Sequence, residues 1–286
     1  MQEPKHLQKE KLYSIGEVSK ICNISKKTLR FYDQIGVIQP DVICKENSYR
    51  YYNRETLLLV PIVKYYKQMG FKLEEMHGLV EGNARDFLEY NFRNKIDELS
   101  IQEQEIRFSF MAVKDWYEMI KEAQLVIQNS VHDIGVKYIS EASYCCQEQE
   151  FEYQYMESII NIEWVNYLES VHNEITGPVI LGYPSYKDKM SGHCKTVKIM
   201  QKAVRPCTAD TNQMTFGGGM YATVYHIGSL KTIDEEYNRI EEWAHNRGYK
   251  CGPECYERYV VDYWATRNEE EFVVEIIVPV VKKPSP

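Results

Sequence analysis

Residues 14–40 read SIGEVSKICNISKKTLRFYDQIGVIQP, and their pattern predicts two short helices joined by a tight turn. Ser14 and Glu17 have the spacing of a capping box, which predicts that the first helix begins after Ser14. Ser25 predicts the start of a second helix, whose first turns carry several cations. Cations beside the positive end of a helix dipole are suited to contact phosphates and base edges. We therefore expect the second helix to be a DNA-recognition helix.

The stretch after this helix pair predicts a two-stranded wing. Gly36–Pro40 stops the second helix, and the hairpin ends in SYRYY at residues 48–52. Tyr and Arg side chains on a hairpin can grip the sugar-phosphate backbone, which positions a protein without reading sequence. Asn53 is expected to cap a third helix that stops at Gly70. The predicted DNA contacts are Lys26, Lys27, Thr28, Arg30, Tyr32, Tyr49, Arg50 and Tyr51.

The run from residue 14, followed by SYRYYNRETL and QMGFKLEEM, resembles the DNA-binding head of the MerR family of transcription regulators. The resemblance implies a winged helix-turn-helix domain over residues 13–82, behind a leader at 1–12. It also implies double-stranded promoter DNA and RNA polymerase at the promoter as partners. In this family the regulator distorts an overlong promoter spacer when its ligand binds, so that DNA shape carries the signal.

Charge is distributed unevenly along the chain. Residues 1–80 hold 13 Lys and Arg against 9 Asp and Glu, whereas residues 81–286 hold 21 against 33. A basic head on an acidic body is what DNA contact by one end requires. The leader lacks an apolar signal-peptide core, and no apolar run approaches the roughly 20 residues that cross a bilayer. We therefore expect a cytoplasmic protein with no membrane partner and with reduced cysteines.

Residues 83–130 are predicted to form a long dimerisation helix. Apolar residues recur every seven positions, at Phe92, Leu99, Ile106, Val113, Ile120 and Ile127, and a second seam contains Ile96, Phe110 and Tyr117. Such heptads favour pairing with another helix, although a long helix packed on its own domain is the alternative. The resemblance to MerR proteins implies an antiparallel pair of these helices, and therefore a homodimer.

Cysteine spacing bears on the kind of ligand. Metal-sensing members of the family carry thiolates at the start of the dimerisation helix and in the loop after it, but no Cys occurs here between Cys44 and Cys145. The pairs Cys145–Cys146 and Cys251–Cys255 have no second pair, and no His at zinc-finger spacing, beside them. We predict no metal site and no cofactor.

Residues 131–286 are predicted to form one domain, in which residues 136–281 repeat one β-α-β-β plan twice. The first copy has a strand from about Val136, a helix over 155–172 and strands near 179–186 and 194–201. The second has a strand over Met220–His226, a helix opened by a capping box of Thr232 and Glu235, and strands near 254–264 and 271–281. GGGMYATVYHIG, YERYVVD and VVEIIVPV in the second copy resemble the GyrI-like effector-binding domain of BmrR-type multidrug regulators. The whole chain is therefore expected to be an α+β protein.

Two acidic residues are candidates for ligand binding. Glu275 is the only charge in Phe272–Val280, and alternation places Glu257 and Tyr259 on one face of their strand. A buried carboxylate is costly unless paired, and a lipophilic cation could pair with it beside aromatic rings. The resemblance implies a ligand-binding role for both glutamates, and Tyr259, Tyr183 and Trp243 are the predicted aromatic walls. For either glutamate the alternative is an internal pair with an arginine, for example Arg258, or a position at a sheet edge in water.

These patterns predict a homodimeric regulator, not an enzyme, that activates transcription when a lipophilic cationic or aromatic compound binds its C-terminal domain. One alternative is a regulator whose GyrI-like domain hydrolyses its ligand, with Glu257 or Glu275 as general base. Another is a constitutive DNA-bending protein that has lost its ligand.

Overall fold

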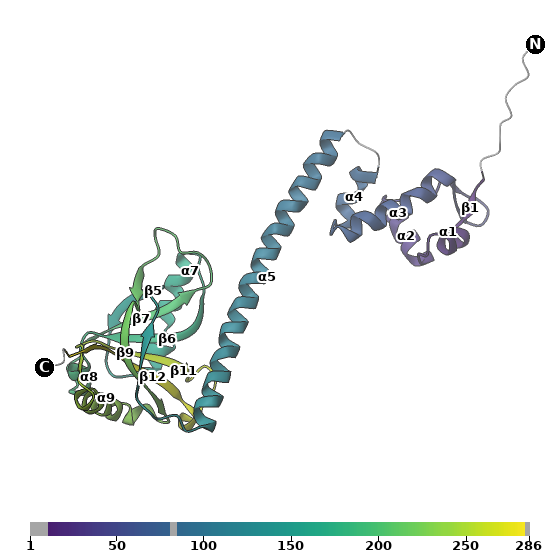
Figure 1. The fold of residues 1–286 in the computed structure, drawn as a ribbon. Coiled ribbons are helices and arrows are strands. Elements are labelled where there is room, and N and C mark those ends of the chain that lie inside the picture. The colour runs from purple at the N-terminus through teal and green to yellow at the C-terminus, as the bar shows by residue number, and fades with distance from the viewer. Residues whose placement is uncertain (1–10, 81–84, 284–286) are drawn as a thin grey trace, which may run out of the picture. The chain divides into compact units, whose positions relative to one another are not determined.

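A computed structural model of the chain describes residues 11–80 and 85–283 (Figure 1). The chain divides into two compact units, Met1–Gln104 and Glu105–Pro286. Among the described residues, no helix is both long and apolar enough to cross a lipid bilayer.

The first unit contains the head. Its elements are β1 (Tyr13–Ser14), α1 (Ile15–Ile21), α2 (Lys26–Gln34), β2 (Val42–Ile43), β3 (Arg50–Tyr52), α3 (Arg54–Gln68) and α4 (Leu73–Val80), and the strand order is β1-β3-β2. All three predicted helix caps are confirmed: Ser14 and Glu17 form a capping box, and Ser25 and Asn53 accept hydrogen bonds from backbone N–H groups of their helices. Gly70 ends α3 with a φ of 82°, which a side chain would strain.

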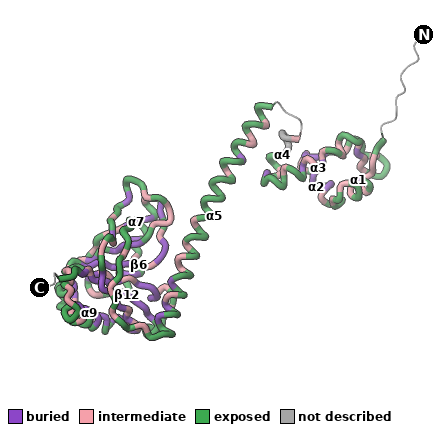
Figure 2. The backbone as a smooth tube through the Cα atoms, in the orientation of Figure 1, coloured by how far each residue is buried: buried purple, intermediate pink, exposed green. Residues whose placement is uncertain are grey.

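The long helix α5 (Arg85–Gln128) begins in the first unit and ends in the second. Most of its residues are exposed, as Figure 2 shows. The predicted seam is among the exposed parts, since Val113 is 69% and Phe110 67% exposed. Phe92 differs from the prediction, because its ring packs against Phe71 at a centroid distance of 5.3 Å and joins the core of the head.

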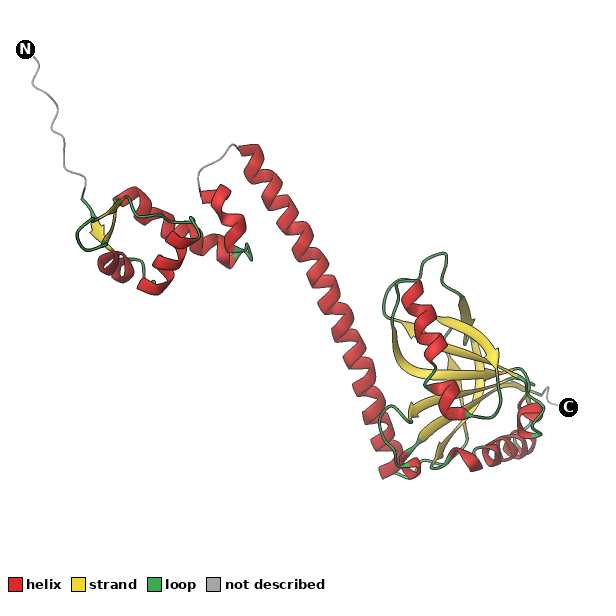
Figure 3. Cartoon of the chain, turned by 180° about the vertical axis from the view of Figure 1, so that it is seen from behind, coloured by secondary structure: helices red, strands yellow, loops and turns green. Residues whose placement is uncertain are grey.

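The second unit is a curled antiparallel sheet with helices packed on it (Figure 3). Its strands are β4 (Gly135–Ile139), β5 (Ala142–Glu150), β6 (Ile175–Tyr183), β7 (Thr196–Ala203), β8 (Gln213–Phe216), β9 (Gly219–Ile227), β10 (Tyr249–Cys251), β11 (Cys255–Val261) and β12 (Val273–Lys282). Its helices are α6 (Tyr155–Ile159), α7 (Ile162–Ser170), α8 (Tyr186–Met190) and α9 (Asp234–Asn246), with short 3-10 turns at Leu230–Thr232 and Glu269–Glu271.

The strand order β4-β9-β12-β11-β6-β7-β5-β8 displays the predicted duplication. The copies β5-α6/α7-β6-β7 and β9-α9-β11-β12 meet at the β6–β11 pair and extend symmetrically to either side. Three details of the prediction are wrong. The helix expected over 155–172 is two helices, α6 and α7. The first copy opens at β5, because the strand near Val136 is a separate one that pairs with β9. Thr232 caps no helix, because it lies in a 3-10 turn and its hydroxyl donates to the Ser229 carbonyl.

Neighbouring residues of β11 point to opposite faces of the sheet. Glu257 accepts a hydrogen bond from Tyr237 of α9, whereas Arg258 pairs with Glu122 of α5. The sheet is therefore covered by α9 on one face and by the C-terminal end of α5 on the other, where Met119 joins the packed apolar residues.

Candidate functional site

The N-terminal part of α2 presents the predicted cations to solvent. Lys26, Lys27 and Arg30 are exposed, while Leu29 of the same helix is buried in the core of the head. Thr28 has a capping role, because its hydroxyl lies 2.7 Å from that of Ser25 and its backbone N–H donates to the same oxygen. Hydrogen bonds therefore hold the backbone at the start of α2, and its cationic side chains are exposed to solvent.

The wing adds a second set of polar groups to these cationic side chains. Arg50 donates from Nε to the carboxylate of Asp33 at 2.7 Å, which ties the wing to α2. Tyr49 is exposed and Tyr51 half-buried. Tyr32 departs from the prediction: it is 2% exposed and packs in the core of the head, so it offers no surface to DNA.

Glu257 lies at the centre of a buried polar cluster on β11. Its carboxylate is 0% exposed and accepts hydrogen bonds from three phenol hydroxyls, which are those of Tyr259 at 2.6 Å, Tyr237 at 2.7 Å and Tyr183 at 3.3 Å. Burial, reinforced by the Glu257 charge, raises the pKa of Tyr183 and Tyr259 far above the usual value, so these hydroxyls remain donors. Two predicted wall residues, Tyr183 and Tyr259, therefore bond the predicted carboxylate directly.

The cation of this cluster comes from the chain itself. The ammonium of Lys189 in α8 lies 2.8 Å from Glu257 and 2.7 Å from Asp234, and it stands 4.8 Å from the centre of the Tyr237 ring. Burial alone would lower the pKa of Lys189, but the charges of Glu257 and Asp234 outweigh burial and raise it. We call Glu257, its three tyrosines and Lys189 the Glu257 cage. No sequence signal marked Lys189.

A solvent-facing cavity of about 540 Å³ lies beside the Glu257 cage. It is lined by Tyr153 of the β5–α6 connection, by Tyr155 of α6 and by Asp234, which pairs with Lys189. A molecule in this cavity would meet Asp234 before Glu257. A cationic ligand of Glu257 would have to displace Lys189.

Glu275 is on the opposite face of the sheet from Glu257. Arg258 is its cross-strand partner and donates from Nε at 2.8 Å, and Lys137 of β4 forms a second ion pair. The same guanidinium bonds Glu122 of α5. Of the alternatives open from the sequence, the internal pair with Arg258 is therefore the one that Glu275 adopts. Its role is to connect the sheet to α5.

Trp243 is not part of either carboxylate site. Its indole stacks on Tyr249 at 6.0 Å, and the guanidinium of Arg247 lies 5.3 Å from the indole. Tyr237, Ile240 and Ala244 form the buried side of α9, and Trp243 is not among the buried residues of that helix.

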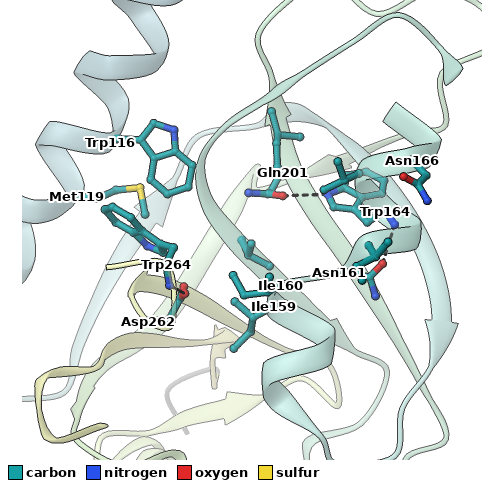
Figure 4. Close-up of a pocket in the computed structure, with 14 residues that line it drawn as sticks. Trp116, Met119, Ile159, Ile160, Asn161, Trp164, Asn166, Gln201, Asp262 and Trp264 are labelled. Atoms are coloured by element: carbon teal, nitrogen blue, oxygen red, sulfur yellow. Dashed lines mark hydrogen bonds between the residues drawn. The ribbon is translucent and has the colours of Figure 1, made fainter. Parts of the chain in front are cut away.

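A cavity of about 270 Å³ lies where α5, α6, α7 and the loop after β11 meet, as Figure 4 shows. Trp116 and Trp264 lie on one side with ring centres 4.5 Å apart, and Trp164 lies on the other. Asp262 lines this cavity, and burial raises the pKa of its carboxyl to about 6. We call it the Asp262 pocket; nothing in the sequence pattern had singled it out.

The cysteines do not gather into a metal site in the described part of the chain, where no three His, Cys, Asp or Glu side chains come together. The Cys145 sulfur lies 3.5 Å from that of Cys207, whereas Cys255 is buried in the core and Cys251 is half-buried beside that core.

Comparison with known proteins agrees with this architecture. Residues 13–83 match the family described as MerR HTH family regulatory protein, and residues 142–281 match the GyrI-like small molecule binding domain. The chain is 24% identical over 281 residues to the multidrug-efflux transporter 2 regulator of Bacillus subtilis (strain 168), covering 95% of this chain and 97% of that protein. The transporter 1 regulator of the same organism is 25% identical over 291 residues, covering 96% of this chain and all of that one.

Among solved structures, the EcmrR–DNA complex determined by cryo-EM is 20% identical and covers 94% of this chain and all of its own, with a TM-score of 0.46. The two family matches lie in the order head, then C-terminal domain, on either side of the long helix α5. The chain therefore joins a helix-turn-helix domain of the MerR family of regulatory proteins to a GyrI-like small molecule binding domain.

Proposed function

We propose that this protein is a ligand-responsive transcription regulator that binds promoter DNA as a homodimer. When a lipophilic cationic or aromatic compound binds the C-terminal unit, the regulator distorts the promoter and activates transcription. The observation that carries the proposal is the combination, in one chain, of a MerR-type head with a GyrI-like small molecule binding domain. Two regulators of multidrug-efflux transporters resemble the chain over nearly its full length. Such a regulator acts where the chromosome is, which we propose to be the cytoplasm.

The DNA contacts that we propose are the exposed or half-exposed members of the predicted set. They lie at the start of α2 and on the wing: Lys26, Lys27, Thr28, Arg30, Tyr49, Arg50 and Tyr51. The cations of α2 would address the phosphates and base edges of one groove, and the wing would hold the backbone beside it. Tyr32 is left out because it is buried.

Homodimerisation is supported by the exposed seam of α5. Replacing Phe110 with Asp would place a charge in the middle of that seam, which pairing would have to bury. We expect Phe110→Asp to convert a dimer into a monomer at micromolar concentration, as measured by sedimentation equilibrium. Gln104→Asp is the matched control, because it adds the same charge on the other side of the helix. A Phe110→Asp protein that remains a dimer would contradict pairing through this seam.

Regulation rather than hydrolysis is the chemistry that the Glu257 cage favours. A general base needs a free lone pair within reach of a substrate proton. Glu257 instead accepts hydrogen bonds from three hydroxyls, forms an ion pair with Lys189 and is 0% exposed. Glu275 is held by Arg258 and Lys137. Neither glutamate is placed to activate water in this arrangement.

To test the proposed function, DNA duplexes that bind the purified protein are selected from a random pool, and the most enriched duplex is footprinted. We expect one palindromic duplex, protected on two half-sites, because a symmetric dimer reads two copies of one sequence. A lipophilic cation that changes Trp fluorescence should also change the cleavage pattern at the centre of the duplex. A pool with no enriched sequence would refute a sequence-specific regulator. All four tryptophans lie between residues 105 and 286, so the fluorescence reports on the C-terminal unit.

A further inference from the structure

Within the described part of the C-terminal unit, one buried carboxylate forms no ion pair. Among the described residues, the buried acids of this unit are Glu236, Glu257, Asp262 and Glu275. Glu236 pairs with Arg239, and the other two glutamates pair with lysine or arginine as described above. Asp262 is 1% exposed, and its one hydrogen-bond donor in the described structure is the backbone N–H of Trp264 at 3.0 Å. A buried charge is normally paired, so Asp262 is the exception.

The surroundings of Asp262 are aromatic. The Asp262 pocket is lined by three of the four tryptophans, Trp116, Trp164 and Trp264, together with Met119. The indole N–H of Trp264 is buried, and within the described residues no acceptor bonds it. Trp164 instead donates to the amide oxygen of Gln201 at 2.9 Å. The pocket thus combines an unpaired anion, an unused donor and ring faces that attract cations.

We propose that the Asp262 pocket binds an aromatic organic cation, with Asp262 as its counter-ion and the indoles of Trp116 and Trp264 as its walls. This inference rests on the proposed function, to which it adds a binding site separate from the Glu257 cage. An acceptor atom on the ligand would satisfy the Trp264 N–H.

The opening of the Asp262 pocket is surrounded by aliphatic side chains, which suits an apolar ligand. Ile160, Ile162 and Val165 belong to the pocket lining and are exposed, with Ile162 76% exposed. Exposed aliphatic side chains around an opening are typical of ligand-binding surfaces. Burial also raises the pKa of Asp262, because it disfavours the charged form of the carboxyl. A bound cation would favour the charged form and so offset this effect.

The position of the pocket explains how occupancy would reach the DNA. Trp116 and Met119 lie on α5, whereas Asp262 and Trp264 lie in the loop that follows strand β11 of the sheet. A ligand between them would contact the dimerisation helix and the sheet at once. If α5 can pack on the sheet in two positions, a ligand that binds one of them more tightly would shift the equilibrium toward that position.

The test is isothermal titration calorimetry of the full-length dimer with 1-benzylquinolinium. Its neutral isostere is 1-benzylnaphthalene, in which a carbon replaces the charged nitrogen. We expect Asp262→Asn to weaken binding of the cation at least about tenfold and to change binding of the isostere less than about twofold. Asp115→Asn is the matched control, because Asp115 is next to Trp116 on α5 but pairs with Lys202 and does not line the pocket. It should leave both affinities unchanged.

Thermal unfolding tests whether Asp262→Asn is folded and whether the native carboxylate lowers the stability of the protein. At about pH 8 the variant should melt several degrees above the wild type, because it removes a buried unpaired charge. Equal affinity of wild type and Asp262→Asn for the cation would overturn the assignment. So would an equal loss for the neutral isostere, which would indicate altered shape rather than charge. Neither result touches the proposed function, whose failure would appear as absent sequence selection on DNA.

Discussion

Replacing Lys26 and Lys27 with alanine is expected to weaken binding of the selected duplex about a thousandfold at roughly 0.15 M salt. Both side chains are exposed at the start of α2. If each neutralises one phosphate, a dimer loses four contacts. Each contact contributes about 0.9 to the slope of log affinity against log salt, so the slope should fall by about 3.6. Electrophoretic mobility shifts over a series of salt concentrations measure both quantities.

The matched control removes the same number of cations from elsewhere in the chain. Lys231 and Lys250 are exposed in the C-terminal unit, and Lys231→Ala with Lys250→Ala should leave the salt slope unchanged. Circular dichroism should show the native helix content in both variants, since none of the four side chains is buried. An unaltered slope in the Lys26→Ala, Lys27→Ala protein would place the DNA on another surface of the head.

Replacing Lys189 with methionine is expected to lower the free energy of unfolding by about 3–5 kcal/mol. The ammonium is buried and pairs with Glu257, so its removal leaves a buried carboxylate without a cation. The three phenol hydroxyls remain as donors, but they supply no positive charge. Urea unfolding followed by Trp fluorescence measures the change in the unit that contains the Glu257 cage.

Two further variants sharpen this test. Lys187→Met is the control, because Lys187 lies two residues earlier in α8 and forms an exposed ion pair with Glu241, for which about 0–1 kcal/mol is expected. Adding Glu257→Gln to Lys189→Met should recover most of the lost stability, because both members of the buried pair are then neutral. A loss under about 1 kcal/mol in Lys189→Met alone would show that Glu257 does not depend on Lys189.

Local signals carried the prediction of the head. Ser14 with Glu17, Ser25 and Asn53 each act within one helical turn, and all three caps formed as expected. Tyr32 was misjudged although a local signal existed. It lies three residues after the buried Leu29, on the same side of α2, which predicts burial rather than contact with DNA.

The ligand-binding residues were harder to predict because their roles depend on strand register and on distant segments. Glu257 and Glu275 lie on neighbouring strands, but Glu275 is opposite Arg258, so the two carboxylates face opposite sides of the sheet. Lys189 reaches Glu257 across 68 residues of sequence from a helix of five residues, too short to leave a periodic pattern. Asp262 became a candidate only because no cation pairs with it among the residues that the structure describes, and no sequence pattern predicts that.

The central claim, that a small molecule acting on the C-terminal unit controls the promoter, is tested most directly by transcription in vitro. The template carries the selected duplex in a promoter spacer, and RNA polymerase, the full-length dimer and 1-benzylquinolinium are added in turn. We predict that the cation increases transcript several-fold with the wild-type protein, and that Asp262→Asn requires at least about tenfold more cation for the same increase. Equal transcript with and without the cation, at concentrations where calorimetry shows the wild-type protein saturated, would contradict the account.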